Sequence, residues 1–429
     1  MRYYSTRNDL EAVNFAAAAL RGLASDGGLF VPEEIPCYRP AVISSLLSMD
    51  FFDIAFETIR PFVHPEIPDS ALKDMVSSAF TFPVPVVPVS NRFVMELFHG
   101  PTAAFKDFGA RFMARAFSYL RRGETKPLKI LVATSGDTGG AVASGFLGVE
   151  GITVTVLYPK GRVSPLQEKQ IAGLGGNVSA LAVEGSFDDC QRLVKLAFSN
   201  KNIRTKFDMS SANSINIARL IPQTVYYTFG AAAFVKSRNK NPVFCVPSGN
   251  FGNLTAGLYA MMMGAPADRF VAATNINKTF PDYLESGAYE ARLSEATISN
   301  AMDVGAPSNF ERMKAHWTLE EMRRLILSVF ITDDETRSTI KDVHEKYGYS
   351  LDPHGAVGWT AVDKLDKKKL LPAERAVILE TAHPAKFAEV VEPLTGPVPL
   401  PPQLAEADRR NAVFTAIPAD INALVDVLQ

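Results

Sequence analysis

The sequence predicts an α/β protein in which two domains built on parallel-type sheets follow a mostly helical N-terminal domain. Short runs rich in β-branched residues alternate with amphipathic stretches from residue 129 to residue 381. This alternation is typical of parallel sheets whose strands are joined by helices. A proline-spaced segment, FPVPVVPVS at 82–90, ends the helical pattern that precedes it. A chain of 429 residues is long enough for two or three domains.

The N-terminal part is predicted to be mostly helical from residue 8 to residue 82, with one break at the turn SDGGLFVPEEIP. Beyond residue 90, we expect strands at six short apolar runs, namely KILVAT, ITVTVLY, NVSALAV, PVFCVP, RFVAAT and RAVILET, which begin at or near residues 129, 152, 177, 242, 269 and 375. The expected helices cover 103–122, 141–148, 187–199, 215–236, 254–263, 318–330, 333–347 and 418–428.

One further helix has a clear start, because Ser164-Pro165-Leu166-Gln167 combines a serine N-cap, a proline in the first turn and a capping box. From these elements we expect three domains. Residues 1–90 form the mostly helical domain, residues 91–128 and 225–429 form a large α/β domain, and residues 129–224 form a small α/β domain.

Composition excludes several classes of protein. The chain has 44 basic and 46 acidic residues, a net charge of −2, so no global field attracts it to nucleic acid or to a membrane. The three cysteines, Cys37, Cys190 and Cys245, share no CxxC spacing, and no two of the six histidines have the spacing of metal ligands. The N-terminus has no signal-peptide pattern. We therefore expect a soluble, cytoplasmic protein without a metal site.

A lysine within an apolar helix surface is the first candidate for chemistry. Within HGPTAAFKDFGARF, Lys106 lies off the predicted polar stripe, which consists of Asp107, Arg111, Arg115, Ser118 and Arg122. An ammonium group placed on that apolar surface is costly unless it is paired or neutralised. Lys106 is then either a side chain whose stem covers apolar surface while the amine reaches water, or a desolvated nucleophile.

Two glycine-rich turns favour the second interpretation of Lys106. KILVATSGDTGGAVASGF and PVFCVPSGNFGNLTAGLYAMM both read as strand, turn and helix, and the free amides at a helix N-terminus attract anions. The alternative is that glycine is present at such turns only because the backbone geometry requires it. The nearest approach to a nicotinamide fingerprint, GLGGN at 173–177, follows a helix instead of a strand. A cofactor with one phosphate and a carbonyl group for Lys106 fits better, and this indicates pyridoxal phosphate.

Two further stretches carry candidate ligands. SSANSINIARLIPQ at 210–223 places Asn213 and Ser214 before a helix and Arg219 within it, which suits either ordinary helix capping or an anion clamp. In ILETAHPAKF, Glu380 and Thr381 end a strand, and only one of two successive side chains can face a ring bound at that end.

The order of these motifs and the residues in them resemble those of the threonine synthase family. Members of this family are pyridoxal-phosphate enzymes of the tryptophan-synthase-β-like class (fold type II). The resemblance is to the longer form, which has an extra N-terminal domain. The segments that carry the resemblance run from about residue 3 to residue 390 and include DGGLFVPEEIP, ELFHGPTAAFKDFGARFMA, ATSGDTGGAV, LYPKGRVSPLQEKQ, GGNVSALAVEGSFDDCQRLV, NSINIARL, VPSGNFGNLTAG, ATNINKTF, SNAMDV and TAHPAKF.

The resemblance implies cofactor-binding residues. Lys106 matches the lysine that forms a Schiff base with pyridoxal phosphate and later moves protons, and Thr381 matches the hydroxyl that faces the pyridine nitrogen, so Glu380 would point away. The loop that matches the cradle for the cofactor phosphate consists of Ser248, Gly249, Asn250, Phe251, Gly252 and Asn253. The large domain would bind the cofactor.

The resemblance also implies substrate-binding residues. The loop of the small domain that matches the substrate-carboxylate site consists of Ser135, Gly136, Asp137 and Thr138. The residues that resemble parts of a substrate-phosphate site are Asn213, Ser214, Arg219, Lys160 and Arg162. The implied reaction converts O-phospho-L-homoserine and water to L-threonine and phosphate through a β,γ-elimination and water addition.

Three alternatives remain at this point. A related dehydratase or phospholyase would use the same lysine and loops but release a keto acid and ammonia. A catalytically silent relative would only bind ligands or partners. A nicotinamide-dependent α/β enzyme would lack the lysine-bound cofactor. We expect a small-molecule substrate and a monomer or homodimer.

Overall fold

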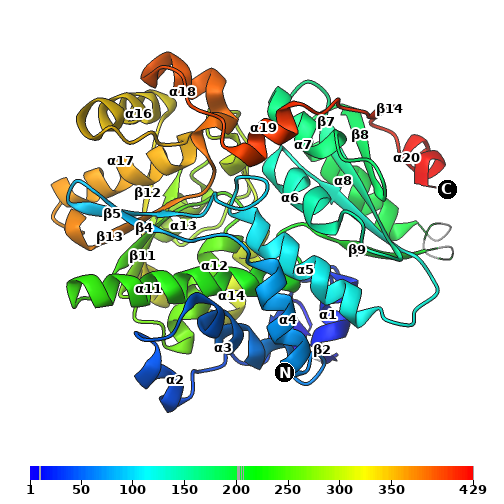
Figure 1. Ribbon diagram of the computed structural model, residues 1–429, viewed down its shortest axis with the longest axis horizontal. Coiled ribbons are helices and arrows are strands. Elements are labelled where there is room, and N and C mark those ends of the chain that lie inside the picture. The colour runs from blue at the N-terminus through cyan, green and yellow to red at the C-terminus, as the bar shows by residue number, and fades with distance from the viewer. Residues whose placement is uncertain (9–10, 201–202, 204, 206, 429) are drawn as a thin grey trace.

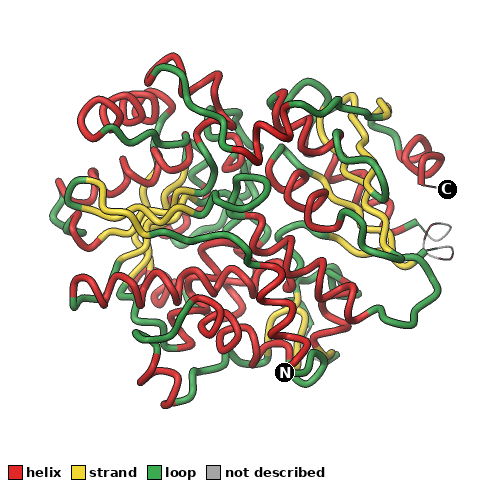
Figure 2. Tube along the Cα trace, in the orientation of Figure 1, coloured by secondary structure: helices red, strands yellow, loops and turns green. Residues whose placement is uncertain are grey.

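The computed structural model describes residues 1–8, 11–200, 203, 205 and 207–428. Two parallel-type sheets dominate it and lie side by side, as Figure 2 shows in yellow. The larger sheet has the order β12, β11, β10, β13, β5, β4, with bounds Ile326–Phe330, Arg269–Thr274, Val243–Pro247, Ala376–Glu380, Arg92–Glu96 and Val86–Val89. All its strands are parallel except the edge strand β4. The predicted α/β class is confirmed.

The smaller sheet has five parallel strands in the order β14, β8, β7, β6, β9, with bounds Thr415–Pro418, Val178–Glu184, Ile152–Pro159, Leu128–Ala133 and Asp208–Ser211. Alternate residues of β6 face opposite cores, as the pleat of a strand requires. Ile130 and Val132 join the core that contains α6, Asp137–Phe146, whereas Leu131 joins the core of α8, Phe187–Ser199.

Helices cover both faces of the larger sheet (Figure 1). On one face lie α11, Thr224–Arg238, and α12, Gly252–Met263, while α16, Asp333–Tyr347, and α17, Pro353–Lys367, lie on the other. The other helices of this region are α13 Thr279–Ser286, η2 Asn300–Met302, α14 Asn309–His316, α15 Leu319–Leu325, η3 Ala373–Arg375, η4 Pro384–Phe387 and α18 Ala388–Thr395. A sheet covered on both faces explains its nearly continuous apolar strands.

The N-terminal domain differs from the prediction of a mostly helical segment. It contains α1 Phe15–Arg21, α2 Pro40–Ser45, α3 Phe51–Val63 and α4 Asp69–Ala79, and also an antiparallel sheet of β1 Arg2–Ser5, β2 Val13–Asn14 and β3 Phe30–Pro32. These strands are too short to show alternation, and β3 lies inside the segment that was predicted as a turn. The hydroxyl of Tyr3 donates to the carbonyl of Phe62 at 2.7 Å, which ties this sheet to α3.

The six predicted strands between 129 and 381 are confirmed. Two predicted helices need correction. The segment 215–236 is divided into α10, Ile217–Leu220, η1, Ile221–Gln223, and α11, and Pro222 lies in the η1 turn. The segment 318–330 is helical only to Leu325, because the β-branched run that follows forms strand β12. The predicted capping box is present at the start of α7, Pro165–Ala172.

The helix that carries the lysine, α5, covers Lys106–Leu120, so it begins at the lysine itself and not at residue 103. Asp107 was expected on the solvent-facing stripe but is completely buried. Its carboxylate accepts hydrogen bonds from the amide and the hydroxyl of Thr102 at 2.9 and 2.7 Å. Asp107 therefore stabilises the turn that precedes α5, as a capping carboxylate does at a helix start.

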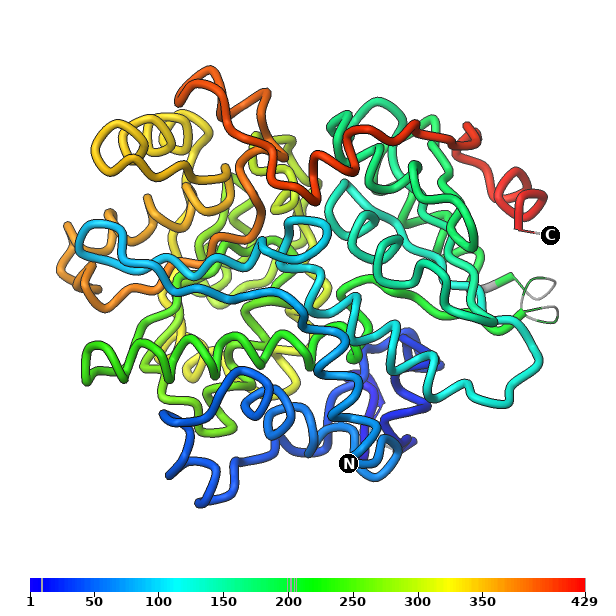
Figure 3. Tube along the Cα trace, in the orientation of Figure 1, coloured from blue at the N-terminus to red at the C-terminus, as the bar shows by residue number. Residues whose placement is uncertain are grey.

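The division into three domains remains a proposal, and strand pairing requires two changes in it. Strand β4 belongs to the larger sheet although it precedes residue 90. The C-terminal segment crosses to the smaller sheet, as Figure 3 shows in red. There β14 pairs with β8, and α20, Ile421–Leu428, packs in the same core as α8. The helix α19, Pro402–Asp408, packs against α7 on the way.

Candidate active site

A cavity of about 350 Å³ lies where the carboxyl ends of strands from both sheets meet. Its lining includes Thr134 and Ser135 after β6, Asn213 after β9, Ser248 after β10 and Thr381 after β13. Open α/β sheets place their ligand sites at the carboxyl ends of parallel strands. The cavity is therefore the candidate active site, and most of the residues predicted from the sequence line it.

Lys106 lines the cavity from the first turn of α5. The amine lies 5.2 Å from the ring centre of Phe105 and faces the cavity, so it keeps some contact with solvent. Burial lowers the pKa of Lys106 to about 8, with Asp137 opposing this shift and Arg219 and Lys386 adding to it. The amine consequently loses its proton, and becomes nucleophilic, at a lower pH than an ordinary lysine does. The interpretation as a desolvated amine agrees with this environment.

The loop from Ser248 to Asn253 and the N-terminus of α12 form one wall of the cavity. Among the described residues, none accepts a hydrogen bond from the backbone amides of 249–253. Asn253 accepts from the hydroxyls of Tyr226 and Tyr227, and its buried Nδ2 atom has no partner. Free amides at a helix N-terminus form a site for an anion such as phosphate.

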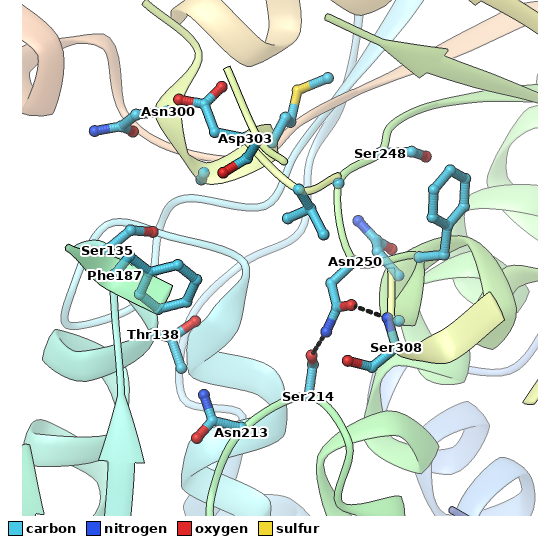
Figure 4. Close-up of a pocket in the computed structure, with 18 of the residues that line it drawn as sticks. Ser135, Thr138, Phe187, Asn213, Ser214, Ser248, Asn250, Asn300, Asp303 and Ser308 are labelled. Atoms are coloured by element: carbon cyan, nitrogen blue, oxygen red, sulfur yellow. Dashed lines mark hydrogen bonds between the residues drawn. The ribbon is translucent and has the colours of Figure 1, made fainter. Parts of the chain in front are cut away.

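Asn250 fixes this loop to its surroundings. Its Nδ2 atom donates to the Ser214 hydroxyl at 2.6 Å, and its Oδ1 atom accepts from the amide of Ser308 at 2.5 Å. Figure 4 shows both bonds, with Ser135, Thr138 and Phe187 on the opposite side of the cavity. The side chain of Asn250 thus joins three segments of the wall and holds the loop in one position.

The predicted substrate-carboxylate loop is only partly turned toward the cavity. Ser135 and Thr138 line it, but Gly136 and Asp137 do not. Gly136 has φ +145°, and a Cβ atom there would lie 2.5 Å from the side chain of Gln167, so the turn requires glycine. The Asp137 carboxylate instead accepts a hydrogen bond from Gln167 at 3.0 Å and pairs with Lys386 at 2.7 Å.

The segment from Asn213 to Arg219 reaches the cavity as predicted. The Asn213 amide group bonds to both backbone groups of Ala133, which holds the segment against the end of β6. Arg219 is buried, and one of its terminal nitrogens donates to the Ala212 carbonyl. Its Nε atom is buried without a partner. Because Arg219 lines the cavity, its guanidinium group suits an anionic ligand.

Thr381 and Glu380 lie on opposite sides of their strand, as the resemblance implied. Thr381 lines the cavity, and no described residue bonds to its hydroxyl. Glu380 is completely buried and accepts a hydrogen bond from the amide of Asp352 at 2.5 Å. Burial and the neighbouring Asp352 raise the pKa of Glu380 well above its usual range. The group available at this end of β13 is therefore a neutral hydroxyl.

The structure does not bring Lys160 and Arg162, which were expected at the substrate-phosphate site, to the cavity. Both side chains are exposed and neither lines the cavity. Lys160 pairs with Glu184 at 3.2 Å on the surface of the smaller sheet. The loop after β7 directs both cationic side chains into solvent. Positive charges that follow a strand of the smaller sheet therefore do not by themselves indicate an anion site in the cavity.

Several site residues were not assigned from the sequence. A segment after α13 crosses the cavity and includes Asn300 and Asp303, which Figure 4 shows on one rim. Burial raises the pKa of Asp303 to about 6, against hydrogen bonds from Thr297 and Asn275 that lower it. The motif SNAMDV, which carries part of the family resemblance, was the available signal.

Two other missed residues lie on the larger sheet. His354 lines the cavity, and its Nδ1 atom is 2.5 Å from Asp352 Oδ1. Its Nε2 atom accepts from the amide of Ala301 at 3.3 Å, so it supports the crossing segment. Lys386 is completely buried beside Asp137 and belongs to the quoted motif TAHPAKF. No periodicity or spacing in the sequence indicated either contact.

These residues fit pyridoxal phosphate. The cofactor needs an amine for its carbonyl, an anion site for its phosphate and a partner for its ring nitrogen. Lys106 supplies an amine with a lowered pKa, the amides of 249–253 lack acceptors, and Thr381 offers a hydroxyl. We propose these residues as the cofactor site.

Comparison with known proteins agrees with the geometry and first defines the class. The family described as "Pyridoxal-phosphate dependent enzyme" matches residues 87–382. Since the match covers more than half of the chain and includes the cavity, this is a pyridoxal-phosphate-dependent enzyme of fold type II.

Longer matches define the family within that class. Residues 2–80 match "Threonine synthase N terminus" and residues 355–428 match "Threonine synthase, C-terminal". The chain is 46% identical to threonine synthase of Haemophilus influenzae over 94% of each sequence. It superposes with a TM-score of 0.92 on the structure of threonine synthase from Escherichia coli, at 42% identity over 100% and 99% of the two chains. The chain belongs to the threonine synthase family.

A third relative contains the cofactor. The structure of pyridoxal-phosphate-bound threonine synthase from Brucella melitensis is 37% identical, with a TM-score of 0.91, over 100% of this chain and 98% of that one. Solved structures of a tomato threonine deaminase and of a maize serine racemase, both at 16% identity with TM-scores of 0.58 and 0.53, share the fold alone.

Replacement of Gly249 by alanine tests the proposed phosphate loop. A Cβ atom at this position would lie 2.7 Å from Met302 Cα and 3.0 Å from the carbonyl oxygen of Ala301, both backbone atoms of the crossing segment. Overpacking of this kind costs about 1–3 kcal/mol, so the dissociation constant for pyridoxal phosphate should rise roughly 5- to 150-fold. Titration of the full chain with the cofactor, followed by absorbance, measures this constant.

The matched control is Gly140→Ala within α6, where the added Cβ would lie 3.3 Å from a side-chain carbon of Gln170. We expect this variant to bind the cofactor within about threefold of the original chain, because a helical glycine tolerates alanine where space allows. Equal affinities of the two variants and the original chain would contradict the steric role of Gly249.

Proposed function

We propose that the chain converts O-phospho-L-homoserine and water to L-threonine and phosphate. The observation that carries the proposal is one amine of lowered pKa between two anion sites. The loop 248–253 would bind the cofactor phosphate, and the Arg219 guanidinium would bind the substrate phosphate. A reaction with a phosphorylated cofactor and a phosphorylated substrate requires two such sites at the same time.

The substrate carboxylate is assigned to the small-domain loop. Ser135 and Thr138 line the cavity at the N-terminus of α6, where the helix dipole and free amides favour a negative charge. Gly136 gives the loop its shape, and Asp137 is turned away from the ligand. We therefore propose Ser135 and Thr138 as ligands, with Gly136 and Asp137 as residues that hold the loop.

The phosphate of the substrate is assigned to Arg219, with Asn213 and Ser214 beside it in the cavity wall. Burial lowers the pKa of Arg219 to about 10, so the guanidinium still carries its charge at neutral pH. A buried cation holds the leaving phosphate while charge develops on it, and it does so without reorganising in water.

Lys106 is assigned the proton transfers. Bound pyridoxal phosphate supplies an electron sink that makes the protons next to the substrate amino group acidic. A free amine with a pKa of about 8 can take a proton at Lys106 Nζ and return it, since the pKa of an efficient general base lies near the working pH. The partly buried position of Lys106 limits the access of bulk water to the same proton.

The products formed from O-phospho-L-homoserine test the proposal. Equal amounts of L-threonine and phosphate are expected, with neither ammonia nor a keto acid, when the purified chain is incubated with this substrate and pyridoxal phosphate. Release of ammonia and a keto acid together with phosphate would instead identify a dehydratase or phospholyase and would contradict the proposed function. The matched control is the same incubation with the Lys106→Ala variant.

Among the described residues, no helix is long and apolar enough to cross a membrane. The free cysteines of the structure, Cys37, Cys190 and Cys245, support our proposal of a cytoplasmic location, since a reducing compartment keeps thiols unpaired. The absence of a nucleic-acid partner and the monomeric or homodimeric state stay predictions.

A further inference from the structure

A second buried lysine lies close to the active-site amine. Lys386 Nζ is 2.7 Å from Asp137 Oδ1, and both side chains are almost completely inaccessible to solvent. The same nitrogen donates to the carbonyl of Thr102 at 2.8 Å, immediately before α5. Lys386 lies in η4 after β13 of the larger sheet, whereas Asp137 begins α6 of the smaller sheet. The pair therefore joins elements of the two sheet domains.

The pair is part of a small charged cluster. The charged groups that act on Lys106 are Asp137 from α6, Arg219 from α10 and Lys386 from η4. On its own helix, Asp107 is bound by Thr102 and also lies close enough to interact with Lys386. The other titratable groups that line the cavity are Asp188, Arg292, Asp303 and His354. Asp137 is the carboxylate that acts on Lys106.

Removal of Lys386 would change the partner of Asp137. A buried carboxylate without a partner is unfavourable, so it would attract the nearest other cation. Burial alone raises the pKa of Asp137, but Lys386 and Lys106 bring it to about 2. Lys106 already interacts with Asp137, and without Lys386 it would become the main counter-ion. A protonated Lys106 is neither a nucleophile nor a base.

We propose that Lys386 is a positioning residue that neutralises Asp137, so that Lys106 remains a free amine able to react with the cofactor carbonyl and to exchange protons. The inference rests on the proposed function only for the role of Lys106. It assigns Asp137 to charge balance and not to the binding of the substrate. In the part of the chain that the structure describes, Lys386 Nζ pairs with Asp137 and donates to the carbonyl of Thr102.

The test measures how fast the cofactor-free full chain takes up pyridoxal phosphate between pH 6 and pH 10, by absorbance. Uptake needs the unprotonated amine, so its midpoint should lie near the pKa of Lys106, about 8. Lys386→Met should raise the midpoint by about 1 pH unit or more, which slows uptake roughly tenfold at pH 7. Lys386→Arg keeps the positive charge and should leave the midpoint in place.

Three further variants separate charge balance from loss of structure. The double variant Asp137→Asn with Lys386→Met removes both charges and should return the midpoint to near its original value. Asp137→Asn alone leaves an uncompensated cation and should lower the midpoint. Lys160→Met removes a lysine from an exposed pair with Glu184 and should change nothing.

A role of Lys386 in packing alone would reduce the amplitude of uptake or the stability of the chain without moving the midpoint. An unchanged midpoint in Lys386→Met, or equal shifts in Lys386→Met and the double variant, would overturn the proposal. If Lys386→Met does not fold, the Asp137→Asn variant provides the test. A midpoint of uptake that is unchanged or higher in Asp137→Asn would overturn the proposal. The products formed by the original chain remain a separate measurement, so the proposed reaction and this inference can fail independently.

Discussion

Replacement of Lys106 by alanine is expected to lower kcat for O-phospho-L-homoserine by at least ~10³-fold, because the variant loses both the amine that holds the cofactor and the group that moves protons. The absorbance of the bound cofactor should disappear with it, and borohydride treatment should no longer attach the cofactor to the chain. The fold should persist, because Asp137, which interacts with Lys106, keeps its own ion pair with Lys386 at 2.7 Å.

The spectral and chemical measurements matter because a loss of activity alone would also follow from misfolding. Circular dichroism and thermal unfolding of the variant should match those of the original chain. Lys160→Ala is the matched control, since it removes a lysine from the surface of the smaller sheet. Turnover that survives in Lys106→Ala, or borohydride labelling that maps to another lysine, would refute the role given to Lys106.

The larger part of the fold follows from local signals in the sequence. The six apolar runs predicted as strands form strands because each is long enough to show its pattern and is bounded by turn residues. The capping box at Ser164 forms as predicted because it needs contacts only within one turn. Strands β1 to β3 were missed because they are too short to show an alternating pattern, and β12 was missed because its β-branched run was predicted as the end of a helix. Strands β4, β5, β9 and β14 were also not predicted.

The cavity shows the same division between local and distant information. Lys106 and the loop from Ser248 to Asn253 were predicted because an apolar helix face and a glycine-rich turn carry them within short motifs, whereas the family resemblance alone selected Thr381 over Glu380. The pair between Asp137 and Lys386 joins segments from opposite sheets, and no pattern in one sequence reports such a contact. Lys160 and Arg162, two positive charges in a short motif, were assigned to the site from the family resemblance. They follow a strand of the correct sheet but lie outside the cavity.

Replacement of Arg219 is expected to have the second large effect. This effect is on the affinity for the substrate and not on the affinity for the cofactor. Replacement by alanine should raise the Michaelis constant for O-phospho-L-homoserine roughly 10- to 150-fold, because a hydrogen bond to a charged group contributes about 1.5–3 kcal/mol. Arg219 also lowers the pKa of Lys106, so its loss makes the amine easier to protonate. Steady-state kinetics at pH 9 keep the amine largely free in both proteins and isolate the effect on binding.

Two further variants make the result specific to the guanidinium group. Arg219→Lys keeps a positive charge but lacks the planar donors, so an intermediate Michaelis constant is expected, and it also tests whether the buried site tolerates substitution. Arg162→Ala removes an exposed arginine outside the cavity and should leave the constant unchanged. Binding of pyridoxal phosphate should stay within a few-fold in all three proteins, because the loop 248–253 and not Arg219 is assigned to the cofactor phosphate. An unchanged Michaelis constant in Arg219→Ala, or a loss confined to cofactor affinity, would move the substrate phosphate to another part of the wall.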